Sequence, residues 1–136
     1  ADIHLSIARL AMAQEDYAKA LNQLEANRRL FTDPVQQAQA LYALAVIADK
    51  QLKDRSPDAL KDCALAYMKA VAVARQTPDR KNLPEALVRV AQIQEELGDL
   101  KSASLLYAEV AEEYKGTPIA ATAAREQQRL REKTGM

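Results

Sequence analysis

The chain has 136 residues, a length that fits one domain with a sizeable hydrophobic core. Its 19 basic and 19 acidic residues balance, so no overall field attracts a phosphate backbone or an anionic lipid surface, and we expect no nucleic acid partner. Charged residues and Gln interrupt every apolar stretch before it reaches the roughly 18–20 residues that a membrane span needs. With 49% hydrophobic but only 4% aromatic residues, three Gly and five Pro, the composition predicts long, closely packed helices and excludes a β-sandwich or β-barrel.

The spacing of apolar residues predicts seven helices. In chain order they span residues 2–13, 16–30, 34–52, 57–76, 83–97, 99–114 and 118–133. Asn82, with Glu85 three residues later, resembles a capping box at the start of the fifth helix. Three other starts carry a capping side chain directly before a proline at the first helical position, at Asp33-Pro34, Ser56-Pro57 and Thr117-Pro118.

One helix-pair pattern with small residues at fixed offsets recurs three times along these helices. The copies read His4, Ile7, Ala8, Ala11, Ala20 and Leu24; then Leu41, Leu44, Ala45, Ala48, Cys63 and Tyr67; and then Leu87, Val90, Ala91, Gln94, Ala103 and Tyr107. A helix pair cannot bury its apolar face alone, so such repeats stack on their neighbours. The pattern therefore predicts an all-α solenoid of three helix pairs over a single domain, residues 1–136, with repeats at about 1–33, 34–80 and 82–117 and a last helix at 118–133.

The connections within the three copies differ in length. Gly98-Asp99 supplies a tight corner in the third copy, because Gly readily takes the left-handed conformation that closes a helix. The first copy has Gln14, Glu15 and Asp16 at the same place. In the second copy, the polar segment 50–58 lies between Ala45 and Cys63, which are eighteen positions apart. The corresponding small residues of the first and third copies are twelve positions apart, so the segment indicates a loop insertion.

The pattern resembles the tetratricopeptide repeat (TPR) family, whose unit of roughly 34 residues carries W-x2-L-G-x2-Y, then A-x3-F, then P. The third copy matches best, with Leu87, Val90 and Ala91, then Ala103 and Tyr107. The chain departs from the pattern because no copy begins with Trp and the tyrosine slot of its first helix is never Tyr. The segments 98–107 and 113–118 are similar to those of bacterial envelope members of the family, including lipoproteins of outer-membrane assembly.

The resemblance implies a right-handed solenoid in which the first helix of each pair lines a concave groove that binds a peptide or a helical segment of another protein. Tyr42 is the aromatic expected to anchor the ligand, and the acids Glu85 and Glu95 at one end would favour a basic or neutral segment. Carried over by position, the groove residues are Asp2, Leu5, Arg9, Met12, Gln39, Tyr42, Val46, Asp49, Glu85, Val88, Gln92 and Glu95.

Residue types argue against catalysis and against a metal or other cofactor. His4 is the only histidine and Cys63 the only cysteine, so a dyad between distant positions would still lack an orienting third group. We expect a non-enzymatic protein with no metal site, because the acids are dispersed over helix surfaces. Cys63 fills a small slot between two helices, and Tyr67 and Tyr107 fill the large core slot.

Two roles are open at this point. The first is a protein-protein interaction scaffold, and the alternative is a structural assembly unit that self-associates or stacks with further repeats of a longer chain, for example in bacterial cell-envelope assembly. The helix 118–133 fits either a solvating cap, which a solenoid needs, or a contact between protomers in a homo-oligomer. A lone cysteine leaves both the cytoplasm and the periplasm open.

Overall fold

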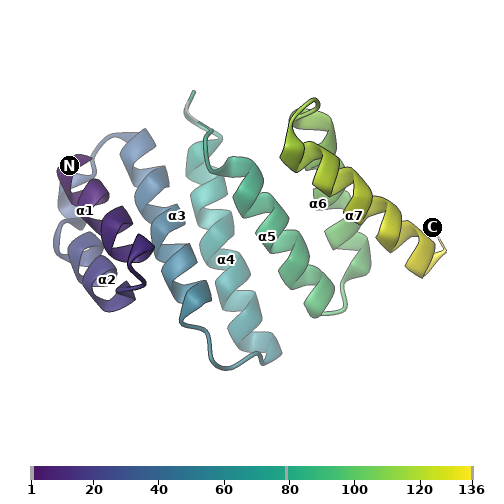
Figure 1. Ribbon diagram of the computed structural model, residues 1–136, viewed down its shortest axis with the longest axis horizontal. Coiled ribbons are helices and arrows are strands. Elements are labelled where there is room, and N and C mark those ends of the chain that lie inside the picture. Colours follow the sequence, from purple (N-terminus) through teal and green to yellow (C-terminus); the bar gives the residue numbers. More distant parts are fainter. Residues whose placement is uncertain (1, 79, 136) are drawn as a thin grey trace. The chain divides into compact units, whose positions relative to one another are not determined.

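The computed structural model describes residues 2–78 and 80–135, without the side chain of Asp2. Ala1, Asp79 and Met136, which the predicted repeat and domain ranges include, lie outside the described residues. Within these residues the chain is all-helical, with a 3₁₀ turn, η1 (Arg28–Leu30), after the second α-helix (Figure 1). The α-helices are α1 (Asp2–Ala13), α2 (Tyr17–Ala26), α3 (Pro34–Lys50), α4 (Pro57–Ala74), α5 (Leu83–Glu96), α6 (Leu100–Glu113) and α7 (Pro118–Thr134).

The predicted helix boundaries agree with the structure to within two residues except at one end. We expected a single helix over 16–30, whereas α2 ends at Ala26 and the chain continues as η1. The cause is Asn27, whose Nδ2 donates to the Gln23 carbonyl oxygen at 2.7 Å. A short polar side chain bonded to the backbone in this way competes with the regular helical bonds and ends the helix.

The three predicted caps before proline are confirmed. Asp33 Oδ1 accepts from the Val35 N–H at 2.8 Å, Ser56 Oγ from Ala59 at 3.3 Å, and Thr117 Oγ1 from Ala120 at 3.3 Å. The predicted capping box at Asn82 and Glu85 is wrong, because the Asn82 side chain makes no capping hydrogen bond. Its backbone, at φ −100° and ψ 4°, lies outside the extended region that aims a capping side chain at the next turn.

The corner between α1 and α2 and the corner between α5 and α6 have the same backbone geometry. Asp16 lies at φ −90° and ψ 73°, and Asp99 lies at φ −88° and ψ 74°. Each aspartate accepts from the backbone N–H three residues later at 3.2 Å and donates its own N–H to a carbonyl of the preceding helix at 2.8 Å. The equivalence of these two segments, inferred from the repeat pattern, is therefore visible in their backbones.

The chain divides into two compact units, Ala1–Arg80 and Lys81–Met136, and the division falls between the predicted second and third repeats. The expectation of one domain over 1–136 stays a prediction. In the N-terminal unit α1 packs on α2, α3 packs on α4, and α3 also contacts α1 and α2. The small residues of the pattern pack between the paired helices, since Ala8, Ala20 and Ala45 are fully buried and Cys63 nearly so.

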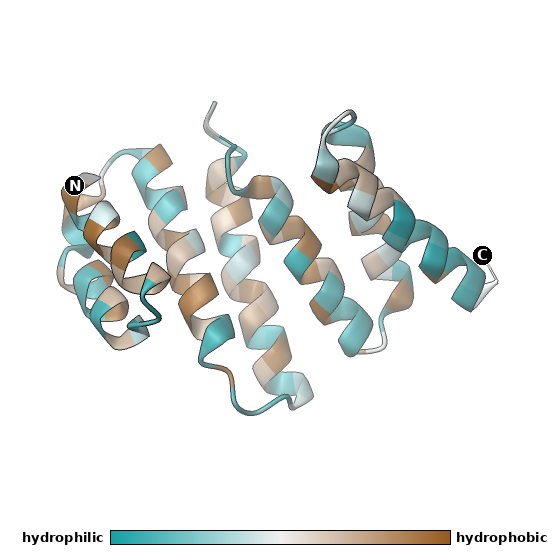
Figure 2. Ribbon diagram, viewed as in Figure 1, coloured by the Kyte–Doolittle hydropathy of each residue, from teal (hydrophilic) through white to brown (hydrophobic). Residues whose placement is uncertain are grey.

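In the C-terminal unit α6 packs against α5 and α7, and α7 also contacts α5. Ala91, Ala103 and Tyr107 are buried here, as expected for the third copy, and so is Leu130 of α7. The second half of α7 is strongly hydrophilic (Figure 2). None of the helices in the two described stretches has the length and apolar character to cross a bilayer.

Candidate functional site

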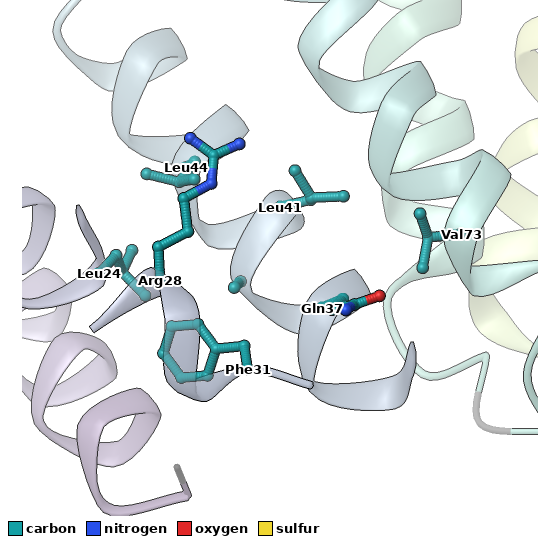
Figure 3. Close-up of a pocket in the computed structure, with 8 residues that line it drawn as sticks. Leu24, Arg28, Phe31, Gln37, Leu41, Leu44 and Val73 are labelled. Carbon is teal, nitrogen blue, oxygen red and sulfur yellow. The ribbon is translucent and has the colours of Figure 1, made fainter. Parts of the chain in front are cut away.

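An apolar groove lies in the N-terminal unit, where α2 and α4 each pack on α3. We call it the α2–α4 groove. Its first hollow has a volume of about 220 Å³, with Leu24, Arg28 and Phe31 on one side, Val73 on the other and Leu41 and Leu44 between them (Figure 3). A second hollow shares Arg28, Leu41 and Leu44, reaches Ala45 on α3 and continues over α4, where it is lined by Asp62, Leu65, Ala66 and Lys69.

The groove follows from where the flanking helices begin and end. Because α2 stops at Ala26 and gives way to η1, Phe31 turns inward and is buried in the core beside Leu24. The α4 helix, with 18 residues, is much longer than α2, with 10. Leu41 and Leu44 consequently remain only half-buried on the floor, although the repeat pattern assigns them to core positions.

Charged side chains surround the apolar floor. Arg28 approaches Glu25 at 3.8 Å, and both side chains are more than half exposed, so the pair is weak and the guanidinium is accessible from the groove. On α4, Asp62 and Lys69 line the second hollow one turn to either side of Leu65 and Ala66. An apolar floor with a mixed-charge rim suits an amphipathic segment.

The α2–α4 groove differs from the groove predicted from the sequence. Phe31, Leu65 and Val73 were not among the residues that the sequence pattern predicted to bind a ligand. The available signal was Phe31, the only phenylalanine, which lies outside the periodic pattern just before a capped proline. Its position there indicates that the connection itself enters the core.

Tyr42 and Asp49, two residues of the predicted concave groove, are held against α4. The Tyr67 O–H donates to Asp49 Oδ2 at 2.6 Å, and the Tyr42 ring packs on Tyr67 with 6.1 Å between ring centroids and planes tilted by 59°. Burial, reinforced by the hydrogen bond to Asp49, raises the pKa of Tyr67. These contacts leave Tyr42 half-buried as a packing partner of a core tyrosine.

One residue of the predicted groove is misplaced. Leu5 is only 2% exposed and belongs to the core cluster with Leu24 and Phe31, so the prediction that it lines an open groove is wrong. The physical reason is that α2 and α3 both pack on α1, and their apolar residues cover this position. Met12 is partly buried against the same cluster, whereas Arg9 is exposed.

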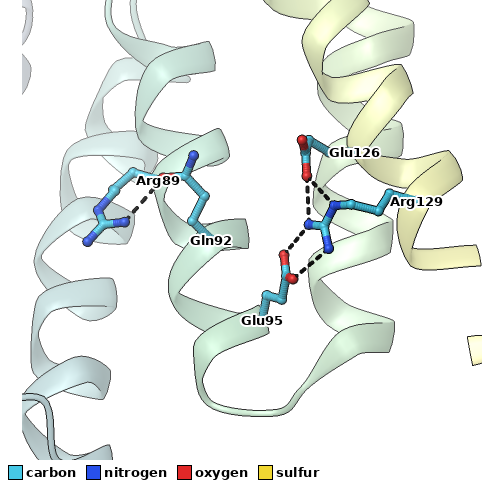
Figure 4. A network of polar contacts seen from close by, with 5 residues as sticks. All are labelled: Arg89, Gln92, Glu95, Glu126 and Arg129. Atoms are coloured by element: carbon cyan, nitrogen blue, oxygen red, sulfur yellow. Dashed lines mark hydrogen bonds and ion pairs between the residues drawn. The ribbon is translucent and has the colours of Figure 1, made fainter. Parts of the chain in front are cut away.

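The other predicted groove residues keep varying degrees of exposure. Gln39 and Val46 on α3 are half-buried, as is Val88 on α5, while Glu85 and Gln92 are exposed. Gln92 Oε1 accepts from Arg89 at 3.1 Å (Figure 4). The side chain of Asp2 lies outside the described part of the chain.

Glu95, expected to give one end of the groove an acidic character, is paired within the C-terminal unit. Arg129 of α7 donates to both carboxylate oxygens of Glu95, at 2.6 and 2.8 Å, and its Nε donates to Glu126 at 2.8 Å (Figure 4). The guanidinium holds the pKa of Glu95 below its usual range. The expected preference for a basic segment is thereby weakened, because Arg129 already offsets the charge of Glu95.

The lone histidine and cysteine take part in packing and polar contacts. His4 Nδ1 lies 2.7 Å from Gln23 Nε2, which links α1 to α2, and the thiol of Cys63 is buried between α3 and α4. Within the residues that the structure describes, no group of three or more His, Cys, Asp or Glu side chains is placed to hold a metal ion.

Comparison of the sequence with models of known protein families gives no match, and a search of curated proteins also gives none. The resemblance to tetratricopeptide repeats therefore stays a prediction.

Proposed function

We propose that the chain is a TPR-like, right-handed α-solenoid of three helix-pair repeats with α7 as its C-terminal cap. Two observations support the proposal. The corners at Asp16 and Asp99 share one geometry. In each copy the two small residues at the contact between the paired helices are buried, namely Ala8 and Ala20, Ala45 and Cys63, and Ala91 and Ala103. The charged outer side of α7 suits a terminal cap, because a solenoid must shield its last apolar face from water.

The function that we propose is a non-enzymatic interaction scaffold that binds an amphipathic helix or peptide of another protein. The observation that carries it is the α2–α4 groove, whose floor of Leu41 and Leu44 is apolar and incompletely covered. We place the ligand here rather than beside Tyr42, since Tyr42 and Asp49 already have partners on α4.

The groove is tested by selecting a random-peptide library on the immobilised chain and measuring the binding of selected peptides by fluorescence polarisation. Leu65→Arg places a charge in the second hollow, where Leu65 is 55% exposed, and we expect it to weaken binding at least tenfold without lowering helix content. Leu105→Arg is the matched control, because Leu105 is 64% exposed in the middle of α6 and is remote from the groove in sequence.

Equal binding by both variants, or no selected peptide at all, would refute the groove as a ligand site. A selected peptide that loses affinity on Tyr42→Ala but not on Leu65→Arg would move the site to the surface first expected from the sequence.

The second role is structural assembly, in which the chain stacks on further helical repeats. One observation favours it. Ile3 and Leu10, both on α1, are two of the most exposed large apolar residues in the described part of the chain.

A further inference from the structure

The outer side of α1 carries an apolar face that no other part of the described chain covers. Ile3 is 67% exposed and Leu10 is 61% exposed, and Ser6 between them is also exposed. These residues lie three and four positions apart, so they share one side of the helix. Two large apolar side chains on a single helical face indicate a contact surface more strongly than scattered exposed residues do.

The second copy of the pattern shows what covers the equivalent face of α3. His4 and Leu41 begin their copies, so residues 3, 6 and 10 of α1 correspond to Ala40, Ala43 and Ile47 of α3. In α3 these three residues are buried, with Ile47 only 1% exposed. They belong to one core cluster with Leu5, Ala8, Leu24 and Phe31 of the preceding helix pair.

The cover at the equivalent positions is thus an antiparallel helix pair. We infer that Ile3, Ser6 and Leu10 form the docking surface for another helical hairpin, located ahead of Ala1 in the same polypeptide, which packs on α1 as α1 and α2 pack on α3. The inference rests on the second proposed role, structural assembly, and is independent of ligand binding in the α2–α4 groove.

A second copy of the chain fits this face less well. The helix that covers α6 at the other end is α7, and its exposed residues include Arg125, Gln128, Arg131 and Glu132. The described exposed surface of α7 therefore has no apolar face comparable to the face of α1 and α2 on which α3 packs. Pairing of α1 with the α1 of a second copy would bury one short helical face per partner, whereas stable interfaces bury about 800 Å² per partner.

The test compares residues 1–136 with the natural full-length gene product. Amide hydrogen exchange of α1 is expected to be at least tenfold slower in the full-length product. The double substitution Ile3→Ser/Leu10→Ser should leave the Tm of residues 1–136 nearly unchanged, because both side chains are exposed there, but should lower the Tm of the full-length product by several degrees. Leu105→Ser, which changes an equally exposed leucine, should leave both melting temperatures unchanged.

Three results would overturn the inference: a gene product with no helical hairpin ahead of Ala1, equal exchange of α1 in both proteins, or a dimer of residues 1–136 that the double substitution dissociates. The groove residues are untouched by these substitutions, so peptide binding measured in parallel shows whether the interaction role fails separately.

Discussion

Glu15 occupies, at φ 60°, the corner position between α1 and α2 that Gly98 occupies, at φ 88°, between α5 and α6. The aspartate that follows each of them caps the second helix of its pair with the same backbone angles. A left-handed conformation costs a residue with a Cβ atom about 1–2 kcal/mol, whereas Gly adopts it freely. The same turn is therefore strained in one copy and relaxed in the other.

We expect Glu15→Gly to raise the Tm by a few degrees, a gain of about 0.5–1 kcal/mol after the greater entropy of Gly in the unfolded chain is subtracted. Gly98→Ala should lower stability by about 1 kcal/mol for the same reason, since no atom lies within 4 Å of the added Cβ and only the backbone angle opposes it. Circular dichroism melting measures both. Gln14→Gly, at a neighbouring position with negative φ, is the control and should not stabilise.

We expect Tyr67→Phe to destabilise the chain by about 1–2 kcal/mol, because it removes the hydrogen bond to the half-buried Asp49 carboxylate. Tyr107→Phe is the control, because Tyr107 fills the equivalent core slot and the pKa of its hydroxyl is raised by burial and by the charges of Glu126 and Glu95 rather than by a hydrogen bond. Its substitution should therefore lower the free energy of unfolding by less. Urea unfolding of the two variants measures the difference. Equal losses would mean that the hydroxyl of Tyr67 contributes nothing through Asp49.

Glu95→Gln should make the stability of the C-terminal unit less sensitive to acid. The pKa of Glu95 is lowered in the folded chain by Arg129, so the ion pair stabilises the fold above the unfolded value of about 4.3 and loses its effect as the pH falls through the folded value. The free energy of unfolding of the wild type should exceed that of the variant by up to about 1 kcal/mol at neutral pH, and the two should converge as the pH falls below the unfolded value and through the lower folded value.

Unfolding curves collected across this pH range provide the measurement. Glu112→Gln, which changes an exposed glutamate on α6, is the matched control and should show no such convergence. If the free energies of unfolding of the wild type and Glu95→Gln differed by the same amount at every pH, the ion-pair explanation would be wrong.

Gln94→Met should stabilise the chain by about 1 kcal/mol. The Gln94 Oε1 atom is buried and has no hydrogen bond partner among the residues that the structure describes, and an unpaired buried acceptor carries a desolvation penalty of about 1–3 kcal/mol. Met has a similar length and no such atom to satisfy. Thermal melting checks the gain, and Gln92→Met, at an exposed position on the same helix, should change stability by less than about 0.5 kcal/mol.

Local signals in the sequence were sufficient to locate the helices and much of the core. Asp33, Ser56 and Thr117 cap their helices through bonds that span two or three residues, so neighbouring residues alone specify these starts. The burial of residues such as Ala8, Ala45 and Ala91 could be predicted from the sequence, because a close-packed helix pair requires small side chains at a fixed spacing. The end of α2 was misjudged because it depends on one side chain, Asn27, bonded back to the helix.

The tertiary structure decided which faces of those helices are covered. Leu5 is buried and Tyr42 packs on Tyr67 because of how neighbouring helices rotate and cross, and these angles depend on many side chains distant in sequence. The bond between Arg129 and Glu95, 34 residues apart, and the groove beneath Arg28 arise in the same way. Periodicity along a helix therefore identified which residues share a face, whereas only the packing of one helix on another determined what that face meets.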